Sequence, residues 1–192
     1  MSNEMTRKYA VVDLEATNAG ATAAIIQVGI VIIEEKEVVE TYQTDINPHE
    51  PLSDHIKALT GITDAQLAQA PEFSQVAKTI YELISDCVFV AHNVKFDANL
   101  LAEALFFEGY ELLTPRVDTV ELAQIFYPSL EKYTLGHLSA ELGLELEEAH
   151  TAIADARATA ALFIKLLQKI ESLPKECLES LLPYADSLLF ET

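Results

Sequence analysis

The sequence predicts an α/β fold in which a mixed β-sheet carries helices on both faces. Three observations predict it: three apolar, β-branched runs follow one another near the N-terminus, two further apolar runs come later, and helical patterns lie between and after those two. The order is strand-strand-strand-helix-strand-helix-strand-helix. A meander followed by alternating helices and strands is typical of a mixed sheet between helical layers. We therefore expect five strands, the first three forming a meander.

The meander is expected at residues 9–14, 25–33 and 38–46. The first two runs are rich in Val and Ile, as buried strands are. The third alternates polar and apolar residues, which favours a partly exposed strand. Two prolines, Pro48 and Pro51, then end the meander because proline cannot donate a ladder hydrogen bond.

Helices and short strands fill the rest of the chain. Two short helices open with capping-type residues, and the later helices show apolar spacing of three and four. The expected elements are helices at 53–59, 64–69 and 73–84, a strand at 87–91, a helix at 95–107, a strand at 116–118, and helices from Thr119, at 133–142 and at 151–170. Pro174 breaks the last helix, so we expect one domain over residues 8–172. Residues 173–192 then form either a docked C-terminal helix or a linker.

Composition sets limits on the function. The chain has 192 residues, half of them hydrophobic, which suits one globular domain. Two cysteines are too few for a disulfide framework and fit a reducing cytosol, so we expect a cytoplasmic protein. No apolar run reaches the ~18 residues of a membrane span. The net charge of −19 repels nucleic acid at long range, so composition alone argues against a nucleic-acid enzyme.

Four carboxylates and one histidine nevertheless form a pattern. Asp13 and Glu15 lie two residues apart at the end of the first strand, on one face. Asp97 opens the helix after the fourth strand, where helix capping would be its ordinary role. Asp155 follows His150 by five residues, so the two cannot share a helical face, and we expect the histidine in the preceding loop. The last helix is rich in alanine, which lets Asp155 approach the strand carboxylates.

Carboxylate oxygens are the ligands that Mg²⁺ and Mn²⁺ prefer. Two carboxylates 4 Å apart repel by about 4 kcal/mol at an effective dielectric constant of 20, so four of them resist clustering without cations. Two divalent ions ~3.5–4 Å apart would neutralise the cluster and hold both oxygens of an in-line phosphoryl displacement. A neutral imidazole nearby can accept the proton of the attacking water. An isolated Asp-x-Glu, by contrast, is more often a solvated strand end.

Three motifs, taken in order, resemble those of the DEDDh 3′–5′ exonucleases, the family of the proofreading epsilon subunit of bacterial DNA polymerase III. They are VVDLEAT at 11–17, VAHNVKFDANLL at 90–101 and HTAIADARATAAL at 150–162. Two spacers, at 56–71 and 133–144, also match in order. The resemblance implies a ribonuclease-H-like fold. It also implies hydrolysis at the 3′ end of single-stranded or frayed DNA, with release of nucleoside 5′-monophosphates.

The same resemblance implies roles for individual residues. Two divalent cations, Mg²⁺ or Mn²⁺, would be bound by Asp13, Glu15, Asp97 and Asp155, and His150 would be the general base. The candidates for holding the terminal nucleotides are Leu14, Ala16, Thr17, Leu59, Ile62, Asn93 and Phe96. Stacking on Leu59, Ile62 or Phe96 would tolerate salt and suit an acidic chain. Plain core packing is the alternative, favoured for Phe96 and equally weighted for Ile62.

Two other functions stay open. The same ligand set serves 3′–5′ exoribonucleases that act on short RNA. A catalytically silent nuclease-like module that docks a helicase or polymerase is the second alternative, against which the intact five-residue set argues. The C-terminal segment resembles the one that joins such a nuclease to a helicase in some Gram-positive DinG-type proteins. This implies a fused or associated helicase or polymerase, whose ATP-binding motif would lie outside this chain.

Overall fold

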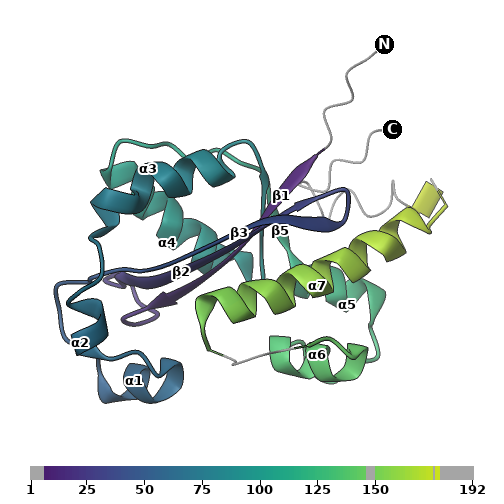
Figure 1. Cartoon of the computed structure of the whole chain (residues 1–192). Helices are drawn as coiled ribbons and strands as arrows, with labels where there is room; N and C mark the ends of the chain where they lie inside the picture. Colours follow the sequence, from purple (N-terminus) through teal and green to yellow (C-terminus); the bar gives the residue numbers. More distant parts are fainter. Residues whose placement is uncertain (1–6, 146–149, 175, 178–192) are drawn as a thin grey trace, which may run out of the picture.

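A five-stranded mixed sheet lies between two layers of helices in the computed structural model, which describes residues 7–145, 150–174 and 176–177 (Figure 1). Its strands, in the spatial order β3-β2-β1-β4-β5, are β1 Lys8–Ala16, β2 Ile25–Glu34, β3 Glu37–Asp45, β4 Val88–Ala91 and β5 Arg116–Asp118. The first three pair antiparallel, whereas β4 and β5 continue the sheet in parallel from β1. The predicted α/β fold with its N-terminal meander is confirmed.

The helices also follow the predicted order. They are α1 Asp54–Thr60, α2 Asp64–Leu67, α3 Phe73–Ile84, α4 Val94–Phe107, α5 Thr119–Phe126, α6 Leu135–Leu142 and α7 Ala152–Glu171. Helix α6 begins two residues later than predicted, with Thr134 as its N-cap. Most of the predicted C-terminal segment, 173–192, lies outside the described residues. Among the described helices, none is long and apolar enough to cross a membrane.

The two faces of β1 carry different cores. Ala10, Val12 and Leu14 pack against α3 and α4, while Val11 packs against α5, α6 and α7. Figure 1 shows α3 and α4 on one side of the sheet and α7 with α5 and α6 on the other. Since alternate residues of a strand point to opposite faces, Asp13 shares the α7 face with Val11. The polar end of β1 therefore lies under the start of α7.

Gly29 lets α7 approach β2 closely. A Cβ atom at this position would lie 2.3 Å from the carbonyl oxygen of Ala152, the first residue of α7. Gly29 is also the register partner of Asp13 on β1. The absent side chain on β2 thus brings the first turn of α7 over the acidic end of β1.

Candidate active site

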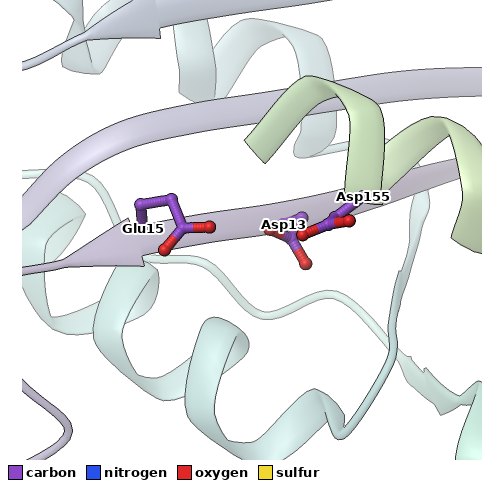
Figure 2. Close-up of side chains that lie close together, drawn as sticks. All are labelled: Asp13, Glu15 and Asp155. Carbon is purple, nitrogen blue, oxygen red and sulfur yellow. The ribbon is translucent and has the colours of Figure 1, made fainter. Parts of the chain in front are cut away.

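Three carboxylates from two elements meet at the α7 face of the sheet. Asp13 and Glu15 come from β1, and Asp155 comes from the first turn of α7. One oxygen of each lies within 4.8 Å of the others. Figure 2 shows Asp155 reaching down from α7 beside Asp13, with Glu15 further along the strand. The structure brings these three predicted residues together.

Asp97 lies beside this group and is fixed to β1. It is 6% exposed, and its Oδ1 accepts a hydrogen bond from the Leu14 N–H at 2.9 Å. It is not part of the three-residue cluster that could hold an ion in this geometry. Its charge nevertheless acts on both strand carboxylates, as their pKa values show.

The ordinary capping role considered for Asp97 is wrong. Helix α4 begins at Val94, with Asn93 in the N-cap position, so Asp97 lies inside the first turn. The carboxylate of Asp118 instead accepts hydrogen bonds from the N–H groups of Asn93 and Val94 at 3.0 and 3.1 Å. Asp118 also caps α5 by accepting from the Val120 N–H. One side chain therefore satisfies two helix starts, which leaves Asp97 to face β1.

Burial and mutual repulsion raise the pKa values of the clustered carboxyls. Burial, followed by the charges of Asp97, Asp155 and Glu15, raises the pKa of Asp13 well above its ordinary value. Burial, together with Asp155 and Asp97, raises the pKa of Glu15 to about 7. Burial also raises the pKa of Asp97 to about 7, although the Leu14 N–H opposes the shift. The cluster therefore holds protons near neutral pH when no cation is present.

The donor set fits a divalent cation. It consists of carboxylate oxygens, which hard cations such as Mg²⁺ and Mn²⁺ prefer. Burial raises the pKa of Asp155 as well, while the hydrogen bond from His150 lowers it. A nearby cation would favour the ionised form of all these groups, because opposite charge stabilises a carboxylate.

His150 sits in the loop directly before α7, as predicted. Its backbone is left-handed (φ 73°), its side chain is exposed, and its N–H donates to Asp155 Oδ2 at 3.1 Å. This bond joins the loop to the carboxylate that α7 contributes. The other nearby histidine, His92, has a structural role, because both of its ring nitrogens form hydrogen bonds within the protein. Its Nε2–H donates to the Tyr133 carbonyl at 2.7 Å, and its Nδ1 accepts from the Thr119 hydroxyl at 2.8 Å. Burial lowers the pKa of His92, which favours its neutral form.

A family model described as Exonuclease (RNase T) matches residues 10–163 of the chain. This chain belongs to the exonuclease family. An exonuclease hydrolyses phosphodiester bonds, and the sheet of this chain has the ribonuclease-H-like arrangement. The predicted family, fold and enzyme class are thereby confirmed.

Known proteins similar to this exonuclease include a Staphylococcus aureus protein named 3′-5′ exonuclease DinG. It is 39% identical over 185 residues, which are 95% of this chain but 21% of the relative. The chain thus spans about a fifth of the length of the curated relatives it matches. Exonuclease X, solved with 5′ overhanging duplex DNA, superposes with a TM-score of 0.71 at 22% identity, over 93% of this chain and 98% of that one. The nuclease domain of 3′hExo, solved with rAMP, has a TM-score of 0.74 at 19% identity, over 88% and 95% of the two chains.

The substrate candidates on β1 of this exonuclease are buried. Leu14 and Ala16 are 6% and 7% exposed. Thr17 is also buried, and its hydroxyl accepts a hydrogen bond from the Ala24 N–H at 3.1 Å, which closes the loop between β1 and β2. These residues shape the strand end next to the carboxylates.

The remaining substrate candidates differ in exposure. Leu59 is 41% exposed on α1, and Asn93 is exposed at the start of α4. Phe96 is half-buried in the first turn of α4, next to Asp97. Ile62 is 3% exposed and packs in a small cluster with Ile26, Leu52 and Leu67. Leu59, Asn93 and Phe96 therefore keep solvent-exposed surface, whereas Ile62 belongs to the core.

Sequence reasoning missed Gln27 on β2. Its Oε1 accepts a hydrogen bond from the Ala152 N–H at the start of α7, at 2.8 Å. The available signal was a polar residue inside the otherwise apolar run IIQVGIVII. A polar side chain in a buried strand is informative because it needs a hydrogen-bond partner.

Proposed function

We propose that this exonuclease removes nucleoside 5′-monophosphates from the 3′ end of single-stranded or frayed DNA, with two divalent cations and His150 as general base. The observation that carries the proposal is the convergence of Asp13, Glu15 and Asp155 within 4.8 Å, with Asp97 fixed beside them. These are the four carboxylates of the family's motifs. Their raised pKa values support a cation-dependent site.

Asp13, Glu15, Asp97 and Asp155 would hold the two cations, Mg²⁺ or Mn²⁺. When bound, the cations supply Lewis-acid stabilisation of the attacking and leaving oxygens of the phosphoryl group. The carboxyls lose their protons on binding, so the affinity for metal rises with pH. Asp97 keeps its Oδ1 on the Leu14 N–H, which orients its carboxylate toward the end of β1.

His150 is the proposed general base. Its exposed loop position leaves the imidazole accessible to a water molecule, and the bond from its N–H to Asp155 keeps the loop at the acidic cluster. A neutral imidazole would accept the proton of that water as the water oxygen attacks phosphorus. The bond between phosphorus and the 3′ oxygen of the preceding nucleotide breaks, and that oxygen leaves with its electron pair and takes up a proton to become the new 3′ hydroxyl. His92 is unsuited to the role because its ring nitrogens are engaged by Thr119 and Tyr133.

The 3′-terminal nucleotides would be held by the end of β1 and by α1 and α4. Leu59 and Phe96 offer exposed apolar surface for base stacking, and the Asn93 amide offers polar contacts. Leu14, Ala16 and Thr17 would shape the strand end under the terminal nucleotide, and Ile62 would support the loop from the core. Stacking with few phosphate contacts is consistent with a net charge of −19.

The chain would act as the exonuclease domain, residues 8–172, of a longer cytoplasmic protein. Its span of about a fifth of the DinG relatives supports this proposal. A fused or associated helicase or polymerase would then deliver the strand, which compensates for weak intrinsic affinity. Residues 173–192 would be the connecting segment.

The test is a single-turnover assay with 5′-labelled DNA and RNA oligonucleotides of the same sequence in Mn²⁺. We expect a one-nucleotide ladder from the 3′ end of the DNA and 5′-mononucleotide products, both lost in chelator and in Asp13→Asn. Preferential shortening of the RNA would favour the exoribonuclease alternative, consistent with the rAMP complex of 3′hExo. The absence of a ladder at any enzyme excess would favour a silent docking module.

A further inference from the structure

We propose that Gln27 is a positioning residue of this exonuclease. It holds the first turn of α7, and with it Asp155 and His150, over the carboxylates of β1. The inference rests on the proposed metal site. Its evidence is independent of that site, however, because it lies in the hydrogen bonds between β2, β3 and α7.

Gln27 stands in a row of three side chains across the sheet. It is the register partner of Glu15 on β1 and of Asp45 on β3. Register partners on neighbouring antiparallel strands point to the same face, so all three lie on the face that α7 covers. The neutral amide of Gln27 therefore separates two carboxylates and lies directly below the start of the helix.

Both ends of the Gln27 amide are engaged. Its Oε1 accepts from the Ala152 N–H at 2.8 Å, and its Nε2 donates to Asp45 Oδ1 at 2.7 Å. Ala152 is the first residue of α7, so its N–H has no acceptor within the helix. The Asp45 carboxylate oxygen accepts from the NH2 group of the amide, which turns the amide oxygen of Gln27 toward α7. Asp45 thus orients the Gln27 amide so that its Oε1 accepts from the Ala152 N–H.

The position of this bond makes it relevant to catalysis. Ala152 lies between His150 and Asp155 in sequence, and the Asp155 side chain in turn accepts from the His150 N–H. A shift of the first turn would therefore displace the α7 carboxylate and the proposed base together. Displacements of about 1 Å at a reacting centre cost up to about a hundredfold in rate.

The same row reaches a second element. Asp45 Oδ2 accepts from Gln66 Nε2 on α2 at 2.7 Å. Helix α2 follows α1, which carries the exposed Leu59. The Gln27–Asp45–Gln66 chain therefore connects the segment that presents Leu59 with the helix that presents Asp155.

The test compares Gln27→Met with Gln43→Met. Gln43 lies on β3 opposite Gly29, on the same face as Gln27, and is exposed, so it is a matched control. In chelator, hydrogen exchange of the Ala152 amide should quicken at least about tenfold in Gln27→Met and stay unchanged in Gln43→Met, because only Gln27 supplies the acceptor.

Activity and metal binding complete the test. With saturating substrate and Mn²⁺, Gln27→Met should lose about tenfold or more in kcat with KM within about twofold, and should bind Mn²⁺ more weakly by electron paramagnetic resonance titration. Unchanged kcat and Mn²⁺ affinity in Gln27→Met, even with a lower melting temperature, would show a merely structural role and overturn the proposal. Equal losses in Gln43→Met would overturn it too. If the unmodified chain itself fails to bind Mn²⁺, the proposed function is what has failed.

Discussion

At the scale of single residues, the Asp13 carboxyl shows how the acidic site lowers the stability of the folded chain. Burial and three neighbouring carboxylates raise its pKa, so its charged form is unfavourable in the metal-free chain. Each neighbour that would serve as a ligand also repels the others. The cluster is therefore a local source of instability that a cation removes, and both its pH dependence and its metal dependence follow.

The metal-free chain should lose stability as the pH rises from about 4 to about 7. The pKa values of Glu15 and Asp97 are about 7 in the folded chain, against about 4 for carboxyls in an unfolded chain. The folded state therefore binds more protons across this window, and the free energy of unfolding falls with increasing pH. Urea titrations in chelator from pH 4.5 to 8 measure the slope.

Two controls accompany this pH series. The double variant Glu15→Gln, Asp97→Asn should show a shallower decline, because it removes two of the groups that hold protons. Saturating Mn²⁺ should offset the decline in the unmodified chain, since binding of a ligand to the folded state stabilises it. Stability that is flat or rising in chelator between pH 4.5 and 7 would contradict the raised pKa values.

His150→Ala and Asp155→Asn should distinguish the role of a general base from that of a metal ligand, because they should differ in their response to Mn²⁺. We expect His150→Ala to keep most of the melting-temperature rise that Mn²⁺ gives, while turnover falls on the order of 10²–10⁴-fold. Asp155→Asn should lose both the Mn²⁺-induced rise in melting temperature and the turnover, because it removes a negative charge that binds the cations. Thermal melts with Mn²⁺ or chelator, paired with single-turnover rates, measure the two effects. Near-native turnover with a normal pH profile in His150→Ala would rule out its role as base.

At the scale of elements, the active site depends on how closely α7 packs against β2. The first turn of α7 passes over Gly29, and Gln27 binds the first N–H of the helix from below. Further along, Phe163 of α7 packs edge-on against Tyr9 of β1, with ring centroids 4.9 Å apart. The helix is thus held at its first turn and again just past its middle, and the first turn, over Gly29, carries Asp155.

Gly29→Ala should disable the enzyme through this contact. The new Cβ would meet the Ala152 carbonyl oxygen at 2.3 Å, so α7 must move away from β2. We expect a loss of about 1–3 kcal/mol in the free energy of unfolding and a larger fractional loss of turnover than of folded protein. Gly20→Ala is the control, since its Cβ would meet only the Asn18 side chain, at 3.1 Å. Full activity in Gly29→Ala would contradict the close approach.

At the scale of the whole molecule, charge limits how the enzyme can hold its substrate. A chain with 31 acidic and 12 basic residues has few cations to place against phosphates. Some of these cations pair with acids, as in the ion pairs Lys57–Asp64 and Lys8–Glu34. Substrate binding should therefore depend on base contacts and on the metal ions, and delivery by a fused partner would offset the long-range repulsion.

Binding of a short single strand should depend only weakly on salt. Two or three phosphate contacts give a slope of about −1.4 to −2 in a plot of log K against log salt concentration. Fluorescence anisotropy with Ca²⁺ in place of the catalytic ions, between 50 and 300 mM salt, measures the slope. A slope that corresponds to eight or more phosphates would mean that an extended basic track binds the strand.

The fold class, the order of the strands along the chain and the positions of the four carboxylates follow from the amino-acid sequence alone. These features are local: the apolar runs of β1 and β2, the alternation of β3 and the alanine-rich start of α7 each carry their own periodicity. The spacing of Asp13 and Glu15 alone puts them on one face of a strand. The place of His150 in a loop before α7 also followed from helical geometry.

The hydrogen-bond partners of these residues depend on the folded chain and could not be predicted from the sequence. Asp118 caps α4 in place of Asp97, and Gln27 meets Ala152 across 125 positions of sequence. Neither contact can be recognised from sequence periodicity, because each depends on strand register and on the distance between a helix and the sheet. Asp97 is free to face β1 only because a side chain from β5 satisfies the start of its helix. The chemistry of the site is thus present in the sequence, while its geometry is set by contacts between distant elements.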